Sequence, residues 1–219
     1  MKISHHPGDE LILDYTSGAL GETWSLAVAT HLAVCPHCRQ SASIMEDVGG
    51  SLLDAAPGLP LDGAFEALSS RLEGVEQKNP SRIAPRNVAT AKPVLPQPLR
   101  RYIGCDIEDV QWQRLGMGAF QKIIPTGEEG TTARLLRIPA GRPVPVHSHG
   151  GLELTLVLCG AFSDVTGHYG PGDFQETDET LEHQPHAAPV EDCICLAVTD
   201  APLRFNSLAA RLVQPFLQI

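Results

Sequence analysis

The stretch HLAVCPHC, His31 to Cys38, is compatible with two different folds, and the residues around it favour one of them. A Cys-Pro-His-Cys pair between a strand and a helix is typical of thioredoxin-like redox proteins. The same pair on a helical hairpin, with a histidine four residues before it, is typical of a zinc site. The residues before His31 follow a helical pattern, so the sequence favours the helical arrangement.

His31, Cys35 and Cys38 are spaced to act as three ligands of one zinc ion. Residues four apart on a helix share a face, and a turn at the start of the next helix brings the two cysteines together. Structural zinc takes four ligands in a tetrahedron, and the fourth could be His5 or His6. The alternatives are a thiol oxidoreductase and a pair of cysteines without a metal.

Apolar residues recur at helical spacing on both sides of this stretch and predict four short helices. They begin near Asp9, Thr23, Cys35 and Leu61. The last helix has one apolar stripe, which is interpreted either as packing on the other helices or as a partner-binding face. The stripe consists of Leu61, Ala64, Phe65, Leu68, Leu72 and Val75.

A proline-rich segment separates these helices from a part with strand patterns. Residues 79–98 hold five prolines and almost no periodic apolar pattern, which is typical of a linker. After it, short runs rich in Leu, Ile, Val and Phe alternate with Gly, Pro and Asp, which predicts an antiparallel sandwich or barrel. We expect helices over residues 1–78, a basic linker over 79–101 and a β-domain over 102–219.

A second group of metal-ligand residues lies in GRPVPVHSHGGLELTLVLCG, Gly141 to Gly160. His147 and His149 are two apart, so on a strand they project to the same face, and Glu153 follows four residues later. A third histidine from another strand, His183, would complete a site of three histidines and one carboxylate. Such ligands accommodate zinc, iron, manganese, nickel or copper.

Two histidines compete with His183 for the third position, namely His186 and His168. Cys193 and Cys195 are also two apart on an expected strand, so both sulfurs lie on one face. They are interpreted as core residues, with a thiol pair near the metal as the alternative.

Composition and charge limit the classes of function. The chain is 42% hydrophobic with no signal peptide and no apolar run of about 18 residues, so we expect a cytoplasmic protein without a membrane span. The net charge is −10, and both the helical and the strand parts are acidic. This charge argues against direct nucleic-acid binding and fits a basic protein partner.

The helical part resembles the zinc-binding anti-sigma domain, through HxxxCxxC with a histidine at the N-terminus. The resemblance implies that the fourth helix docks on an extracytoplasmic-function sigma factor. The implied zinc ligands are His6, His31, Cys35 and Cys38. The implied partner-binding residues are Phe65, Leu68, Leu72 and Val75.

The strand part resembles the cupins, through G-x5-H-x-H-x3-E-x6-G and the turn YGPGD, Tyr169 to Asp173. The resemblance implies an antiparallel β-barrel with a metal in its interior, zinc or another divalent transition metal. The implied ligands are His147, His149, Glu153 and His183.

The whole arrangement resembles the ChrR family of anti-sigma factors, which join a zinc anti-sigma domain to a cupin domain. In that family the N-terminal domain holds the sigma factor, and the cupin domain is needed to release it under photo-oxidative stress, particularly singlet oxygen. The resemblance therefore implies an inhibitor and not an enzyme. The alternative is a metal-dependent cupin enzyme, such as a dioxygenase, with a regulatory helical domain.

Overall fold

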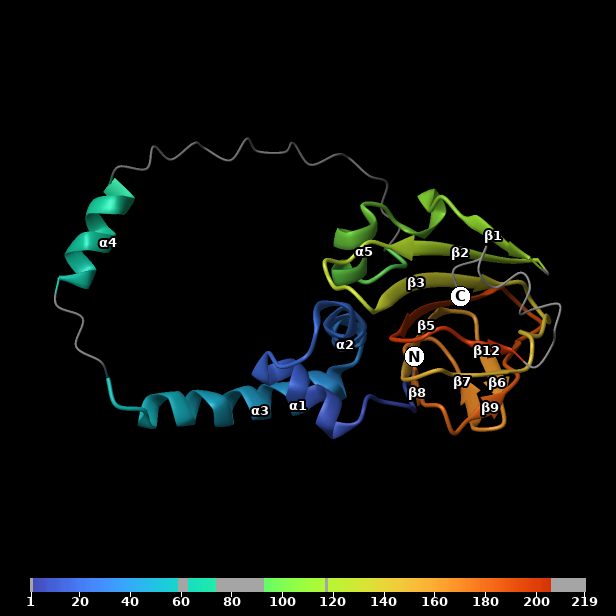
Figure 1. The fold of residues 1–219 in the computed structure, drawn as a ribbon, viewed down its shortest axis with the longest axis horizontal. Coiled ribbons are helices and arrows are strands. Elements are labelled where there is room, and N and C mark those ends of the chain that lie inside the picture. Colours follow the sequence, from blue (N-terminus) through green and yellow to red (C-terminus); the bar gives the residue numbers. More distant parts are fainter. Residues whose placement is uncertain (1, 59–62, 74–92, 117, 206–219) are drawn as a thin grey trace. The chain divides into compact units, whose positions relative to one another are not determined.

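The computed structural model describes residues 2–58, 63–73, 93–116 and 118–205. Helices come first along the chain and antiparallel strands follow, as Figure 1 shows. The chain separates into two compact units, residues 1–48 together with 93–219, and residues 49–92. Val75 and residues 79–92 of the expected linker lie outside the described residues, so the expected three-part division stays a prediction.

Three helices begin the chain: α1 (Asp9–Ser17), α2 (Glu22–Val34) and α3 (Pro36–Ala55). α1 ends at Gly18, whose φ of 74° is a left-handed conformation that glycine adopts without strain. α2 ends at Cys35, and Pro36 begins α3, since proline is tolerated in a first helical turn. The Cys-Pro-His-Cys stretch therefore joins two helices, as the sequence pattern indicated.

Helix α5 (Gln97–Ile103) begins inside the segment that was expected to be a linker. Pro98 lies in its first turn, where the missing N–H costs nothing, and Gly104 ends it at a φ of 81°. A single 3₁₀ turn, η1 (Ile107–Asp109), follows. None of the helices in the described part of the chain is long and apolar enough to cross a bilayer.

The main sheet has six antiparallel strands in the order β1-β2-β3-β11-β5-β8 (Figure 1). Their bounds are β1 (Gln113–Gly116), β2 (Ala119–Ile124), β3 (Thr132–Ile138), β5 (Glu153–Cys159), β8 (Phe174–Thr177) and β11 (Cys193–Thr199). β11 lies at the centre and pairs with β3 and with β5.

Two smaller antiparallel sheets complete the strand part, with the orders β10-β6-β7 and β12-β4-β9. Their bounds are β4 (His147–Ser148), β6 (Phe162–Asp164), β7 (Gly167–Tyr169), β9 (Glu182–His183), β10 (His186–Ala187) and β12 (Arg204–Phe205). Over residues 93–116 and 118–205 the ladders do not join into the closed barrel that we expected. The small strands have two or three residues, and Pro145 and Pro185, next to β4 and β10, cannot donate to a ladder.

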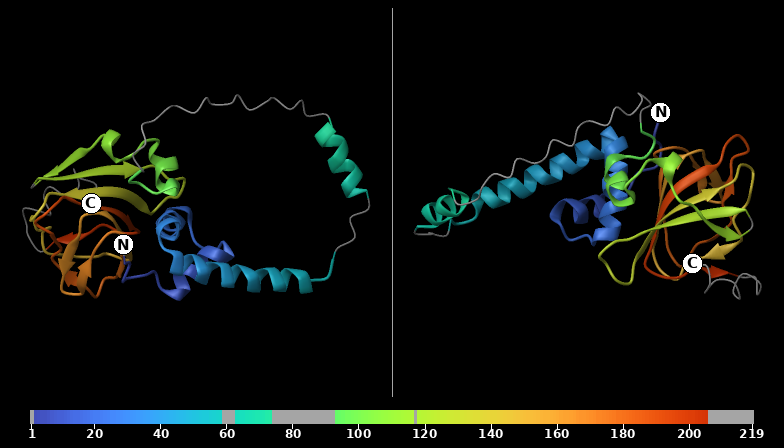
Figure 2. Two further views of the ribbon diagram at one scale, coloured as in Figure 1. Left: turned by 180° about the vertical axis from the view of Figure 1, so that it is seen from behind. Right: turned by 90° about the horizontal axis from the view of Figure 1, so that it is seen from above.

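The main sheet is buried on both faces, which explains why its central strands are almost continuously apolar. On one face, Leu135, Leu156 and Leu196 share a core with Leu26 of α2 and Leu99 of α5. Figure 2 shows these two helices beside the sheet. The other face lines a cavity that contains the second group of metal-ligand residues. The first helices and the strand part thus share one hydrophobic core.

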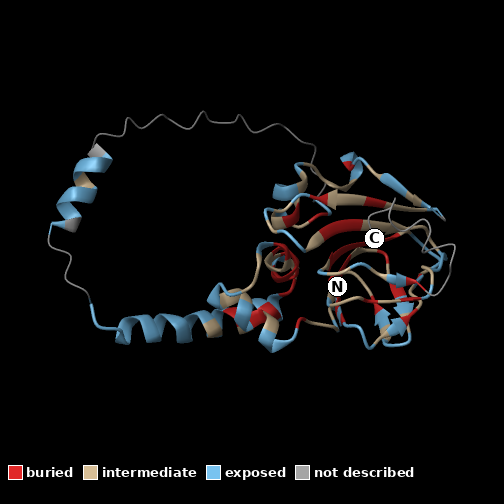
Figure 3. Cartoon of the chain, viewed as in Figure 1, coloured by how far each residue is buried: buried red, intermediate tan, exposed pale blue. Residues whose placement is uncertain are grey.

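Helix α4 (Ala64–Glu73) belongs to the second unit and is exposed, as Figure 3 shows. The exposed fractions of Phe65, Leu68 and Leu72 are 77%, 55% and 64%. Where burial is described in this unit, at residues 49–58, 63 and 65–72, no residue is buried. The apolar side chains of α4 at Phe65, Leu68 and Leu72 are therefore exposed within the described part of this unit.

Candidate metal centres

Four side chains predicted to bind zinc meet at the junction of α2 and α3: His6, His31, Cys35 and Cys38. Their ligand atoms all lie within 4.8 Å of one another. The Cys38 sulfur lies 3.2 Å from Nε2 of His31 and 3.3 Å from Nδ1 of His6. Zinc bonds of about 2.3 Å to sulfur and about 2.0 Å to nitrogen require spacings of this size in a tetrahedron.

Burial shifts the pKa values of two residues in this cluster. It lowers the pKa of His31 to about 4, so its imidazole is neutral and able to coordinate. It raises the pKa of the Cys38 thiol to about 12. A bound cation would stabilise the thiolate form that burial disfavours.

The structure brings His6, and not His5, into the cluster. The His5 ring lies against Tyr169, with ring centroids 4.4 Å apart. His37, which directly precedes Cys38, packs its ring 5.0 Å from the ring of His6 and adds no ligand atom.

Residues of the strand part position this cluster, which the sequence did not indicate. Oδ1 of Asp173 accepts hydrogen bonds from the backbone N–H groups of Ser4 at 2.6 Å and His5 at 2.9 Å. The N–H of Phe174 donates to the carbonyl of His5, and its ring lies 5.5 Å from the ring of His31. The segment that carries His6 is therefore held by the start of β8.

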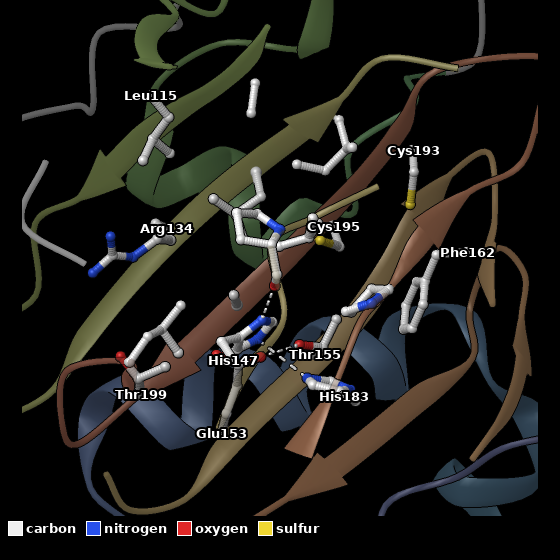
Figure 4. A pocket seen from close by; sticks show the side chains of 18 of the residues that line it. Leu115, Arg134, His147, Glu153, Thr155, Phe162, His183, Cys193, Cys195 and Thr199 are labelled. Carbon is white, nitrogen blue, oxygen red and sulfur yellow. Dashed lines mark hydrogen bonds between the residues drawn. The ribbon is translucent and has the colours of Figure 1, made fainter. Parts of the chain in front are cut away.

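The second cluster brings together the Nε2 atoms of three buried histidines. β4 pairs with β9 in a register that puts His147 directly opposite His183, and His149 follows β4. Nε2 of His183 lies 3.2 Å from Nε2 of His147 and 3.1 Å from Nε2 of His149. Figure 4 shows His147 and His183 from this cluster at the wall of the cavity.

Hydrogen bonds at Nδ1 determine which nitrogen lone pairs face inward. Nδ1 of His147 lies 2.7 Å from the carbonyl oxygen of Pro145, and Nδ1 of His183 lies 2.6 Å from the carboxylate of Asp164. Each Nδ1 therefore donates its proton, which leaves Nε2 as an acceptor. Two acceptors 3.2 Å apart cannot bond to one another, so the pair is suited to share a cation.

Glu153 lies beside the three histidines but outside the group of converging nitrogens. Its carboxylate is 3.6 Å from Nδ1 of His149 and accepts a hydrogen bond from the Thr155 hydroxyl. Burial raises the pKa of Glu153 to about 7. Gly150 allows the close turn before Glu153, because a Cβ there would lie 2.8 Å from the carbonyl oxygen of Pro202.

The competing histidines lie elsewhere. Nδ1 of His186 contacts the carbonyl of Gln184, and Nδ1 of His168 contacts the hydroxyl of Ser163, with both side chains exposed. Cys193 and Cys195 are buried on the cavity face of β11 as free thiols. Hydrogen bonding of the Cys195 thiol with Cys193, together with burial, raises the pKa of Cys195.

The cavity beside the histidines has a volume of about 1380 Å³ and lies between the main sheet and the two small sheets. His147, Glu153 and His183 line it, and so does Arg134, as Figure 4 shows. Sequence reasoning missed Arg134 and Asp164, and it gave Asp173 only as the end of the turn YGPGD. The contacts of these residues were not predictable, because they form between segments that are distant in sequence.

Comparisons with known proteins agree with this architecture. A family model described as the ChrR Cupin-like domain matches residues 100–202. The anti-sigma-E factor ChrR of Cereibacter sphaeroides is 48% identical over 220 residues, which cover 100% of both chains. A chain in the crystal structure of Rhodobacter sphaeroides SigE in complex with the anti-sigma ChrR is 44% identical, with a TM-score of 0.77. That match covers 90% of this chain and 99% of the other.

Proposed function

Because this chain belongs to the ChrR family of anti-sigma factors, we propose that it binds and inhibits an extracytoplasmic-function sigma factor. The uncovered apolar stripe of α4 is the observation that carries the proposal. An amphipathic helix that exposes Phe65, Leu68 and Leu72 fits the binding of a partner groove by anchors spaced three and four residues apart. Val75, predicted for the same surface, lies outside the described residues.

α3 supports the same proposal, because it also exposes large apolar side chains. The exposed fractions of Val48, Leu52 and Leu53 are 57%, 69% and 75%. Burying one such side chain on a partner contributes roughly 1.5–3 kcal/mol. Helices α3 and α4 therefore both expose apolar side chains that a bound partner would bury.

The role proposed for His6, His31, Cys35 and Cys38 is a structural zinc site. Four protein ligands leave no open position, which is typical of structural and not catalytic zinc. Zinc bound there would stabilise the junction of α2 and α3, since the free energy of binding at such a site is free energy of folding.

The role proposed for the second cluster is a sensor. His147, His149 and His183, with Glu153, would hold zinc or another divalent transition metal. A metal bound there supplies a Lewis-acidic centre inside a buried cavity. Release of the sigma factor under oxidative stress, such as singlet oxygen, is the proposed output of this part.

A regulator is favoured over a metal-dependent cupin enzyme. The relative that matches the full length is named an anti-sigma factor, and the related crystal structure is a complex with SigE. The net charge of −10 fits a protein partner better than direct contact with nucleic acid. The proposed compartment is the cytoplasm, where a sigma factor meets RNA polymerase.

The test is co-purification of the zinc-loaded full chain with each extracytoplasmic-function sigma factor of its host. A stable complex that blocks transcription from the cognate promoter is expected. Failure to bind any of these sigma factors would contradict the inhibitory function. Glu153→Ala should keep inhibition and lose stress-dependent release, and full induction in this variant would contradict the sensor role of Glu153.

A further inference from the structure

We propose that the cavity of the strand part binds an apolar monocarboxylate and that Arg134 recognises its carboxylate. This ligand site is additional to the proposed inhibition of a sigma factor. Binding of the monocarboxylate can be measured on the full chain without any sigma factor.

Arg134 is a buried guanidinium whose hydrogen-bonding capacity is largely unused. It lies on β3, on the face that also presents Leu136 to the cavity, and it is 6% exposed. Its one side-chain hydrogen bond to the described residues runs from Nη1 to Oε1 of Gln121 at 3.1 Å. Among the described residues, no carboxylate lies within ion-pair distance of Arg134, and Glu153 attracts it only from farther away.

The same strand provides a contrast. Arg137 lies three residues further along β3, and its guanidinium pairs with Asp192 at 2.7 Å on the protein surface. The two arginines therefore differ: Arg137 is partly exposed and ion-paired, whereas Arg134 is buried and has no ionic partner among the described residues. A buried charge is normally retained only with a partner, because its desolvation is costly. The partner missing for Arg134 is an anion that the described chain does not supply.

The geometry of a guanidinium indicates which class of anion would bind Arg134. Its five N–H donors form a planar fork that matches the two oxygens of a carboxylate. One hydrogen bond to Gln121 leaves most of these donors for a ligand. A single arginine balances a singly charged anion, so a monocarboxylate fits better than a more highly charged group.

The side chains that line the cavity indicate that the rest of the ligand is apolar. Leu136, Ile138, Val144 and Phe162 line the cavity, whose volume of about 1380 Å³ exceeds what a carboxylate alone would fill. Sites for small organic ligands are usually about 300–1000 Å³ and mostly apolar. Figure 4 shows Arg134 and Phe162 on opposite sides of the drawn side chains, with His147 and Thr155 between them. A ligand with its charge at Arg134 would extend its apolar body towards Phe162.

The experiment is calorimetric titration of the full chain with decanoate, below its micelle concentration. 1-Decanol and decylammonium serve as uncharged and cationic ligands of the same length, and acetate as the carboxylate without an apolar body. We expect one saturable decanoate site per chain, with each comparison ligand at least about tenfold weaker, as expected for loss of charge-assisted hydrogen bonds or of apolar burial. Equal affinity for decanoate and 1-decanol would overturn the proposal.

Variants test whether Arg134 provides the affinity for decanoate. Arg134→Gln should weaken decanoate binding at least about tenfold, Arg134→Lys should weaken it less, and Arg137→Gln should leave it unchanged. Undiminished binding by folded Arg134→Gln would overturn the proposal. Decanoate binding that is lost only when metal is removed would also overturn the proposal, because the carboxylate would then bind the metal and not Arg134. If Arg134→Gln fails to fold, the proposal is tested by comparing decanoate with the other three ligands on the unmodified chain.

Discussion

The carboxylate of Asp173 accepts a hydrogen bond of 2.6 Å from the backbone N–H of Ser4, across 169 residues of sequence. A second bond, from the N–H of His5, holds the chain immediately before His6. Asp173 leads into β8, and β8 pairs with β5 so that Thr177 lies opposite Glu153. One short strand therefore contacts the surroundings of both candidate metal centres, and it connects the cupin-like part physically to the N-terminal His/Cys cluster.

Asp173→Ala should loosen zinc at the N-terminal cluster. The change removes two charge-assisted hydrogen bonds that hold the segment carrying His6. We expect zinc transfer to a chromogenic chelator to become roughly tenfold faster. Asp178→Ala is the matched control, because that exposed carboxylate is hydrogen-bonded within its own turn, to Thr180. Equal transfer rates in the two variants would show that Asp173 does not support the site.

Zinc affinity at the N-terminal cluster should rise with pH between about 6 and 8. The pKa of His31 is about 4, so His31 is already neutral and releases no proton. The pKa of Cys38 is about 12, so zinc must displace the thiol proton at every pH in this range. Calorimetry in two buffers with different ionisation enthalpies should therefore show release of at least about one proton per zinc. A binding enthalpy that is independent of the buffer would exclude Cys38 as a thiolate ligand.

Asp164→Asn should weaken metal binding at the second cluster. Burial raises the pKa of Asp164, but hydrogen bonds from Thr166, Gln175 and His183 outweigh it and lower the pKa to about 2. The ionised carboxylate therefore orients His183 at neutral pH. Loss of such a partner costs about 10–100-fold in metal affinity. Competition with a metal indicator measures this, with zinc at the N-terminal cluster expected to be unchanged as the internal control. An unaltered affinity would mean that Asp164 does not orient a ligand.

Phe65→Ala combined with Leu72→Ala should weaken sigma-factor binding without loss of thermal stability. These side chains are 77% and 64% exposed, so their removal costs the free chain little. If they anchor the partner, binding should weaken by at least about 2 kcal/mol. Glu66→Ala, on the same helix, is the control. A double variant that binds as tightly as the control would move the interface away from α4.

Leu26→Ala should destabilise the strand part as well as the helices. Leu26 is 3% exposed and lies in the core that contains Leu135, Leu156 and Leu196. Truncation of a buried leucine typically costs about 2–5 kcal/mol. Thermal unfolding should show a single transition at a lower temperature. Leu13→Ala on α1, at a residue 52% exposed, should leave this temperature almost unchanged. Separate transitions, with only one affected, would contradict a shared core.

The sequence predicted the helical and antiparallel parts because local physics marks them. Apolar residues at helical spacing precede His31, and proline at position 36 suits a new helix, so the junction at Cys35 follows from short-range preferences. The spacing of His147, His149 and Glu153 is equally local. The closed barrel was wrong, because the ladders of the small sheets stop after two or three residues, and sequence patterns do not reveal pairing across sheets.

The sequence by itself determined two groups of candidate metal ligands through local spacing. These are His31, Cys35 and Cys38 on one helical hairpin, and His147 with His149 near one strand. Spacing left His5 and His6 open, and the family resemblances implied His6 and His183. The folded chain brings these two histidines into the clusters through contacts with segments that are far away in sequence. The tertiary structure also buried Arg134 without an ionic partner among the residues it describes, and it brought Asp173 to Ser4. Short-range spacing follows from backbone geometry, whereas burial and long-range pairing arise only when the sheet and helices pack into one core.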